Sequence, residues 1–190
     1  MMDTKTKRSR GILIADIAIF IVTLFIDQLS KYLVRSHMQL RDHFDVIPGI
    51  LQVFYHENTG ATWGMLKGQT VFFIFMAVVV CCVLVFLILR IPDGKKYIRM
   101  HVALTLVLSG AIGNTIDRVM KASVTDFIYA VIINFPIFNV ADSFIVVATA
   151  WLIIMVLFIY KDEDLAFMNL GRAEKMRRTD AKKEQEDEES

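Results

Sequence analysis

Four long apolar stretches set the strongest limit on how this chain can fold. They cover residues 12–34, 70–89, 98–116 and 138–160, and an α-helix needs about 20 mostly apolar residues to cross the hydrocarbon core of a bilayer. Hydrophobic residues make up 55% of the 190-residue chain, which is more than an ordinary soluble domain contains. The sequence therefore predicts an α-helical integral membrane protein with four transmembrane helices.

Lysine and arginine are distributed unevenly among the segments that flank these stretches. Residues 1–10 contain four, the turn at 90–99 contains four and residues 161–190 contain seven, whereas the connections 36–68 and 118–137 contain two each. Short segments rich in Lys and Arg stay on the cytoplasmic side of a membrane. We therefore expect both termini in the cytoplasm and the two connections on the outer side.

The segments outside the predicted helices differ in character. We expect residues 1–10 to form a basic cytoplasmic N-terminus, residues 11–160 the four-helix membrane domain, and residues 161–190 a charged cytoplasmic tail that is either a solvated helix or disordered. Residues 44–55 are rich in Val, Ile, Phe and Tyr around the turn Pro48-Gly49, which predicts two short strands. We expect them to form a small extracytoplasmic β-sheet.

Polar and ionisable side chains gather near the predicted outer ends of three of the four helices. They are Asp27, Lys31, Asn114, Asp117, Arg118, Asn139 and Asp142. An ionisable group near the bilayer centre costs about 2.5–3.5 kcal/mol, and the predicted topology places all of these groups at one depth. Polar groups from several helices at one level are what a site inside a helix bundle requires. The sequence therefore favours a functional site close to the outer face.

Structural roles compete with functional ones for several of these residues. Asp27 and Lys31 are four residues apart, so they can form an ion pair that makes two buried charges tolerable. Gly110, Gly113 and Asn114 share one helix face, which is typical of close packing between membrane helices. Packing explains the glycines but not Asn114 with Asp117-Arg118, so a structural role and a site-supporting role both stay open for Asn114 and Arg118.

The other acidic and amide residues are open to similar alternatives. Asn139 can cap the last helix, and Asp142 then lies in the first helical turn, where the helix dipole favours an acid. Asp126 lies in the second predicted outer connection, where an aspartate is usually solvated. Asp16 lies near the basic inner flank of the first helix, and we interpret it as interfacial or paired.

Other catalytic chemistries lack their sequence patterns. The chain has no His-Glu-x-x-His pair, no Gly-x-Ser-x-Gly motif and no glycine-rich phosphate loop after a strand. His37, His43 and His56 lack metal-ligand spacing, and the neighbouring Cys81 and Cys82 cannot form an ordinary disulfide with each other. We expect no metal and no cofactor. The net charge of +1 gives no indication of nucleic-acid binding, and we expect no nucleic-acid partner.

Two non-enzymatic classes stay open beside carboxylate catalysis. A proton-coupled transporter or channel subunit is the main alternative, because intramembrane acids also mark ion paths. Against it, the second apolar stretch has no polar lining, no internal repeat is evident, and the polar groups stop near one face instead of crossing the membrane. A structural scaffold would leave the aligned acids unexplained. Ion flux in proteoliposomes would separate a transporter from an enzyme.

Five short motifs occur in order along the chain, and they are specific in combination although each is weak alone. They are Asp27-Gln28-x-Ser30-Lys31, Asn58-Thr59-Gly60-Ala61, Gly110-Ala111-x-Gly113-Asn114-x-x-Asp117-Arg118, Asp126-Phe127 and Phe138-Asn139-Val140-Ala141-Asp142-Ser143. Over about residues 16–160 the chain resembles the lipoprotein signal peptidases (signal peptidase II), a family of bacterial intramembrane aspartic peptidases.

The resemblance implies a dyad of catalytic aspartates, Asp126 and Asp142, and this replaces the interpretation of Asp126 as a solvated residue. Supporting or substrate-binding roles are implied for Asp27, Lys31, Asn58, Gly60, Gly110, Gly113, Asn114, Asp117, Arg118 and Asn139. Two neighbouring carboxyl groups cannot both ionise readily, so they share a proton and titrate as a unit. Which aspartate carries the proton stays open.

The resemblance also implies a substrate and a location. The implied substrate is a prolipoprotein that is cut just before a diacylglyceryl-modified cysteine. The implied location is the bacterial inner membrane, with the active site near the outer face and next to membrane phospholipid, and we expect a monomer. Thr62, Trp63, Ser109 and Thr125 depart from the residues usual in the family at these positions, which bears on substrate fit and not on the reaction.

Overall fold

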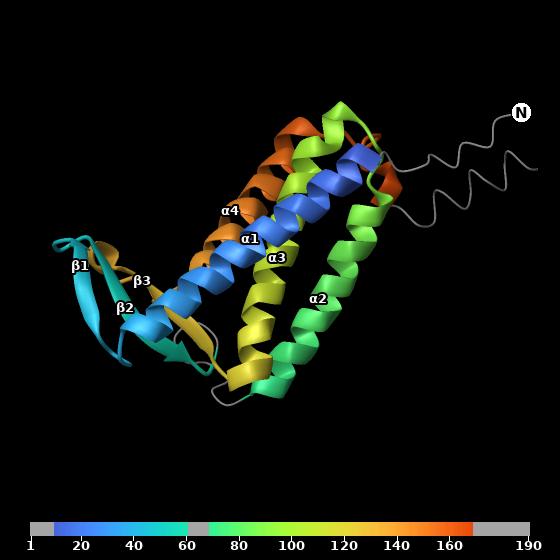
Figure 1. Cartoon of the computed structure of the whole chain (residues 1–190). Helices are drawn as coiled ribbons and strands as arrows, with labels where there is room; N and C mark the ends of the chain where they lie inside the picture. Colours follow the sequence, from blue (N-terminus) through green and yellow to red (C-terminus); the bar gives the residue numbers. More distant parts are fainter. Residues whose placement is uncertain (1–9, 61–68, 169–190) are drawn as a thin grey trace, which may run out of the picture.

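The computed structural model describes residues 10–60 and 69–168, and its four long helices match the four apolar stretches (Figure 1). They are α1 (Arg10–His37), α2 (Thr70–Arg90), α3 (Ile98–Lys121) and α4 (Val140–Ile154), which continues as the π-helical turn η4 (Met155–Ile159). Within the described residues, these are the helices long and apolar enough to cross a membrane. The predicted four-helix membrane architecture is confirmed. The basic N-terminal segment and most of the charged tail lie outside the described residues.

Helix α3 is longer than the sequence predicted, because it ends at Lys121 and not at residue 116. Ala122 closes the helix in a left-handed conformation with φ of 60°, and its backbone N–H donates to Arg118 O. Polar residues fill the last turns, so the loss of apolar character did not mark the end of the helix. Asp117 is therefore a helical residue, and it is 2% exposed.

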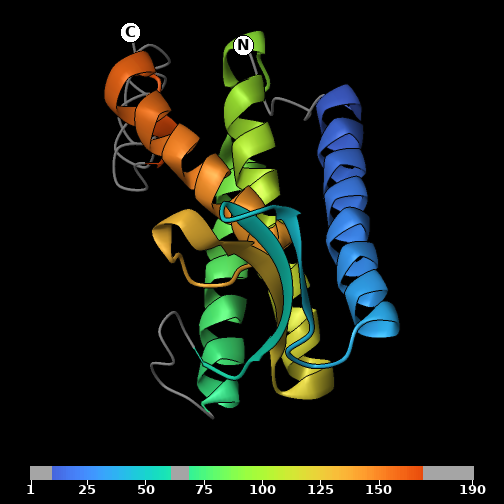
Figure 2. The same ribbon diagram turned by 90° about the vertical axis from the view of Figure 1, so that its left-hand side faces the viewer.

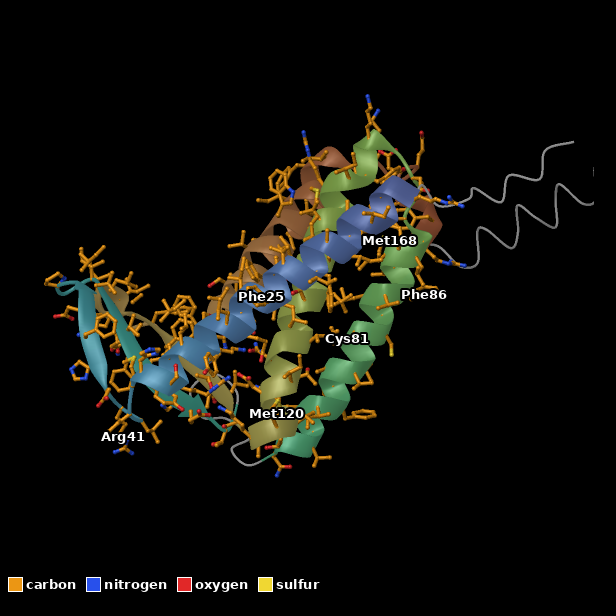
Figure 3. The ribbon with its side chains drawn as sticks, viewed as in Figure 1. Phe25, Arg41, Cys81, Phe86, Met120 and Met168 are labelled. Carbon is orange, nitrogen blue, oxygen red and sulfur yellow. The ribbon has the colours of Figure 1, made fainter. Side chains whose placement is uncertain are left out.

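Helix α3 is also the central helix of the bundle and contacts α1, α2 and α4 (Figures 1 and 2). In its most apolar stretch 44% of the residues are buried, against 11% in each of the other three spans. The other helices carry exposed apolar side chains such as Phe25 on α1 and Phe86 on α2, which are labelled in Figure 3. This distribution is expected of a bundle whose periphery meets lipid.

Polar contacts run along much of the interface between α1 and α3. Asp16 Oδ2 lies 2.9 Å from His101 Nδ1, and Thr23 Oγ1 donates to Ser109 Oγ at 2.7 Å. Of the two interpretations of Asp16, interfacial or paired, the structure shows the paired one, but the expectation that polar groups stop near one face was wrong. Single polar residues on two separate helices meet here, and the apolar character of each stretch taken alone does not reveal that.

Close packing between α3 and α4 depends on Gly110. A Cβ atom at this position would lie 2.6 Å from Ala141 O and 2.7 Å from Ile145 Cγ1. Both distances are far below van der Waals contact, and one of the two atoms belongs to the backbone of α4, which cannot turn aside. Glycine therefore allows the two helices to approach as small residues do in other membrane bundles.

Substituting Gly110→Ala is expected to lower the free energy of unfolding by about 1–3 kcal/mol, because α4 must move away from α3. Thermal unfolding of the purified protein in detergent measures the change. Gly94→Ala is the matched control, since the nearest atom to a Cβ there is Tyr97 Cδ2 at 3.7 Å. A Gly110→Ala protein as stable as the control would contradict the packing argument.

A three-stranded antiparallel sheet lies across the end of the bundle where α1 ends and α4 begins (Figure 1). Its strands are β1 (His43–Ile47), β2 (Leu51–Asn58) and β3 (Val124–Ala130), in the order β1-β2-β3. The two strands predicted within residues 44–55 are confirmed. The third strand lies within the predicted outer connection 118–137, where the sequence patterns predicted no strand. Its partner β2 is distant in sequence, so local patterns did not reveal the pairing.

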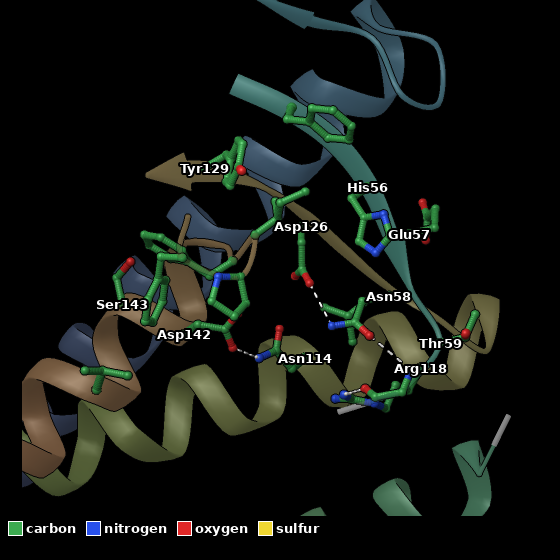
Figure 4. A pocket seen from close by; sticks show the side chains of 18 of the residues that line it. His56, Glu57, Asn58, Thr59, Asn114, Arg118, Asp126, Tyr129, Asp142 and Ser143 are labelled. Atoms are coloured by element: carbon green, nitrogen blue, oxygen red, sulfur yellow. Dashed lines mark hydrogen bonds between the residues drawn. The ribbon is translucent and has the colours of Figure 1, made fainter. Parts of the chain in front are cut away.

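Irregular pairing determines which side chains of β3 share a face of the sheet. The pairing of β2 with β3 shifts register midway, and on the other edge of β3 the N–H groups of Phe127 and Ile128 both donate to Phe138 O. Side chains alternate along a regular strand, and a bulge resets the alternation. In a regular strand, Asp126 and Tyr129 would point to opposite faces, because an odd number of positions separates them. The irregular pairing lets both side chains line the same cavity (Figure 4).

The first residues after η4 fold back onto the turn between α2 and α3. Tyr160 Oη donates to Lys96 O at 2.9 Å, and Tyr97 Oη donates to Asp164 O at 3.1 Å. Lys96 Nζ also pairs with Asp164 Oδ2 at 2.6 Å. The described beginning of the predicted tail is therefore packed against the bundle.

Candidate active site

Asp126 projects from β3 and is almost fully buried, with 2% of its surface exposed. Its Oδ2 accepts a hydrogen bond from Asn58 Nδ2 at 2.9 Å, and its Oδ1 accepts one from Asn139 Nδ2 at 2.7 Å. Burial, followed by the negative charge of Asp142, raises the pKa of Asp126 to about 7, although the two amide donors lower it. The expectation from spacing alone, that this aspartate is solvated, was wrong.

Asp142 lies in the first turn of α4 and forms a reciprocal cap with Asn139. Asp142 N donates to Asn139 Oδ1 at 3.0 Å, and Asn139 N donates to Asp142 Oδ2 at 3.2 Å. Asp142 Oδ1 accepts from Asn114 Nδ2 at 2.7 Å. The predicted capping role of Asn139 is confirmed, and both oxygens of the Asp142 carboxyl group have a donor that fixes them.

The fully buried Asn139 connects the two aspartates, because its side-chain amide donates to Asp126 and its backbone amide donates to Asp142. Figure 4 shows both carboxyl groups at one cavity, Asp126 entering from the sheet and Asp142 from α4, with Asn58 and Asn114 as their partners. Two acids that lie on different elements therefore share one asparagine and one cavity.

Lys31 forms the centre of a second polar network and is completely buried. Its Nζ lies 2.9 Å from Asp27 Oδ2, 3.2 Å from Asp117 Oδ2 and 2.9 Å from Asn114 Oδ1. An ammonium group has three N–H donors, and here each has an acceptor. The predicted pair of Asp27 and Lys31 is confirmed, and Asp117 joins it as a second acid, with Arg35 Nη1 3.7 Å from Asp117 Oδ1.

This network ends on backbone amides that adjoin the two cavity aspartates. Asp27 Oδ1 accepts a hydrogen bond from Ala141 N at 3.0 Å, and Asp117 Oδ2 accepts one from Thr125 N at 3.2 Å. Ala141 and Thr125 each immediately precede a cavity aspartate in the sequence. The buried ion pairs therefore hold the backbone from which both carboxyl groups project.

Two predicted glycines and Arg118 surround these networks. A Cβ atom at Gly113 would lie 2.5 Å from Asp27 Oδ2, so glycine leaves room for the ion pair. Arg118 Nη2 donates to Gly60 O at a long 3.4 Å, and its guanidinium carbon lies 4.9 Å from the centre of the Phe73 ring. Arg118 borders the cavity and touches neither aspartate through a direct hydrogen bond in the described part of the chain.

The cavity has a volume of about 1130 Å³ and extends from the sheet to the helices. Most of its lining was not predicted from the sequence, including Phe54, His56 and Tyr129 on the sheet and Phe73, Val146 and Val147 on α2 and α4. Alternate residues of a strand share one face, so counting back along β2 from Asn58 could have identified His56 and Phe54. Tyr129 had no such signal, because the irregular pairing reverses the alternation.

The two cysteines weighed from the sequence lie apart from this cavity. Cys81, labelled in Figure 3, and Cys82 are free thiols on α2. Among the residues that the structure describes, no three His, Cys, Asp or Glu side chains are arranged to hold a metal ion. The cavity is lined by the carboxyl groups of Asp126, Asp142 and Glu57, and the imidazole of His56, amide side chains and the guanidinium of Arg118 also border it.

Comparison with known proteins places the chain in a family. A family model described as signal peptidase (SPase) II matches residues 19–158. The lipoprotein signal peptidase of Staphylococcus aureus strain MRSA252 is 39% identical over 143 residues, which cover 74% of this chain and 85% of the relative. The corresponding protein of strain JH9 is 38% identical over the same shares.

Solved structures agree with this relationship. A bacterial membrane enzyme determined by the in meso method at 2.3 Å resolution superposes with a TM-score of 0.71 at 37% identity, covering 80% of this chain and 90% of that one. A second, at 1.9 Å resolution, gives a TM-score of 0.70 at 36% identity, covering 81% and 97%. The chain therefore belongs to the signal peptidase II family, and it is a membrane peptidase.

Proposed function

We propose that this protein removes the signal peptide from prolipoproteins by cleaving the bond before a diacylglyceryl-modified cysteine, and that Asp126 and Asp142 are the catalytic pair that activates water. The observation that carries the proposal is the junction at Asn139, which binds both carboxyl groups at one cavity. Two carboxyl groups held together can share one proton, which gives an acid and a base within reach of one peptide bond.

The proposed reaction proceeds without a covalent enzyme intermediate. The Asp142 carboxylate accepts a proton from water while the water oxygen attacks the scissile carbonyl carbon. Asp126, which holds a proton up to about neutral pH because its pKa is about 7, donates that proton to the carbonyl oxygen. The tetrahedral intermediate then collapses: Asp142 donates the proton that it took from water to the amide nitrogen, one hydroxyl group of the intermediate returns a proton to Asp126, and the C–N bond breaks, which leaves a free carboxyl group and a free amine.

Supporting roles follow from the contacts of the neighbouring side chains. Asn58, Asn114 and Asn139 orient the two carboxyl groups. Arg118 borders the cavity without a direct bond to either acid, so it is available to hold the peptide backbone of the substrate. Asp27, Lys31 and Asp117 position the backbone beside the acids and do not touch the substrate.

The proposed orientation places the sheet and the cavity at the outer face of the bacterial inner membrane and both termini in the cytoplasm. The excess of Lys and Arg in the terminal segments and in the turn at 90–99 supports it. Exposed apolar side chains on α4, among them Val146 at 64% and Val147 at 67%, line one end of the cavity. A signal peptide and acyl chains can stay in lipid there while the scissile bond reaches the acids.

Cleavage is expected to slow as the pH rises through about 7. Asp126 must carry a proton to donate it, and a carboxyl group with a pKa of about 7 is protonated below that pH and ionised above it. We expect kcat/KM to fall by up to about tenfold per pH unit above the pKa. A pH–rate profile of the purified enzyme on a lipidated precursor measures this limb. A rate that rises through the same range would contradict the assignment of Asp126 as the acid.

The proposed substrate is tested by giving the purified protein two precursors of identical sequence, one with a diacylglyceryl-modified cysteine and one with an unmodified cysteine. We expect cleavage before the modified cysteine and little or no cleavage of the unmodified precursor, with products identified by mass spectrometry. Equal cleavage of both would show a membrane peptidase that does not recognise the lipid.

A further inference from the structure

Three rings, one from each strand, form a row across the sheet. The ring of His43 on β1 stacks on Phe54 of β2, with centroids 5.7 Å apart and planes 18° apart. Phe54 in turn packs edge-to-face against Tyr129 of β3, with centroids 6.3 Å apart and planes at 71°. His43 and Phe54 are direct partners in the strand pairing, so they stand on the same face of the sheet. We call these three side chains the ring row.

The ring row begins inside the cavity of the two acids and runs away from it. Phe54 and Tyr129 line the cavity together with Asp126, and Tyr129 is labelled beside Asp126 in Figure 4. The other end of the row is the exposed His43 on the edge strand β1. Tyr129 Oη donates to Asn134 Oδ1 at 2.7 Å, so the ring nearest the acids is held in place before any ligand binds.

The two ends of the cavity differ in the surroundings that they offer. Phe73 on α2 and the exposed Val146 and Val147 on α4 form the helix end, and these helices are membrane spans. The ring row forms the other end, on the sheet outside the spans. On the proposed function, the signal peptide and the acyl chains are the apolar parts of the substrate, so they occupy the helix end. The remaining part of the substrate must leave over the sheet.

We propose that the ring row of His43, Phe54 and Tyr129 binds the polypeptide segment that follows the modified cysteine of the substrate. This inference rests on the proposed function and adds a binding subsite to it. Ring faces pack against peptide planes and against side chains of many kinds, so the row binds extended chain with little dependence on its sequence. Gln52, the strand partner of Tyr129, flanks the row, and its Nε2 donates to Asp45 Oδ1 at 2.7 Å.

The test compares two lipidated precursors that are identical up to the cysteine. The short precursor ends at the cysteine as an amide, and the long precursor continues for about six residues, a length of about 20 Å that is enough to cross three strands. In the wild-type enzyme we expect a lower KM for the long precursor. We define the KM advantage as the KM for the short precursor divided by the KM for the long precursor. In Tyr129→Ala and His43→Ala, this ratio is expected to fall about three- to tenfold.

Two further variants separate loss of the rings from general damage. Phe44→Ala removes an exposed ring from the neighbouring position of the same strand, on the opposite face, and it is expected to keep the full wild-type advantage. Tyr129→Phe keeps the ring and loses only the hydrogen bond to Asn134, so it is expected to keep most of the advantage. Because the readout is a ratio of KM values on one enzyme, an overall loss of activity cancels.

The outcomes distinguish this inference from the proposed function. If neither precursor is cleaved by the wild-type enzyme, the proposed function fails. If both are cleaved and the long precursor has no KM advantage, or if Tyr129→Ala and His43→Ala keep the same advantage as Phe44→Ala, the ring row does not bind the downstream segment, and the proposed function stands without it.

Discussion

Substituting Asp126→Asn is expected to reduce cleavage of a lipidated precursor by about a thousandfold or more, with the fold intact. The amide cannot donate and recover a carboxyl proton, although it has nearly the shape of the acid. Asn58 and Asn139 already donate to this position, and the introduced amide can turn its own oxygen toward one of them. Single-turnover cleavage, followed by the release of signal peptide, measures the loss.

Asp45→Asn is the matched control for this prediction, because Asp45 is an exposed aspartate on the same sheet that pairs only with Gln52 among the described contacts. The control is expected to cleave at nearly the wild-type rate. Thermal unfolding and elution volume in detergent establish whether each variant is folded. A folded Asp126→Asn protein that retains near-normal turnover would remove Asp126 from the chemistry.

Substituting Lys31→Met is expected to lower the free energy of unfolding by about 3–5 kcal/mol, which is the usual cost of removing one partner from a buried ion pair. Met has a similar length, so packing changes little, but Asp27 and Asp117 lose the ammonium that balances their charges. The backbone amides of Ala141 and Thr125 are held by the same two acids. We therefore expect turnover to fall together with stability, and Asp27→Ala to act in the same direction.

Lys96→Met provides the comparison, because Lys96 forms a short ion pair with Asp164 and yet its side chain is 52% exposed. Solvent and salt weaken an exposed pair, so little change in stability is expected. Thermal unfolding of both variants in detergent, side by side with wild type, gives the two shifts. Unchanged stability of Lys31→Met with lost turnover would mean that Lys31 acts in the reaction and not in holding the site together.

Local patterns in the sequence account for much of the architecture. The length of each apolar stretch identified the four spans, because a helix must satisfy its own backbone groups in lipid and must cross a fixed thickness. Helical spacing identified the pair of Asp27 and Lys31, and a short turn signal identified the first hairpin. Each of these features is decided by residues that are close together in the chain.

The features that the sequence did not reveal depend on contacts between distant residues. The position of Asp126 between helices predicted a solvated residue, but β2 pairs with its strand and Asn139 covers it. The link from Lys31 to Asp117 joins α1 to α3, and no spacing rule connects them. Family resemblance, and not periodicity, pointed to Asp126. No local pattern pointed to Tyr129, because its orientation depends on irregular pairing along both edges of one strand.

The central claim is that Asp126 and Asp142 work as one catalytic unit, and a double-mutant cycle tests it most directly. Single-turnover cleavage of the lipidated precursor is measured for wild type, Asp126→Asn, Asp142→Asn and the double variant, all confirmed as folded. Each single variant is expected to lose about a thousandfold or more, and the double variant is expected to be no slower than either, because residues that act as a unit are not additive. A single variant that stays within about tenfold of wild type would contradict the claim.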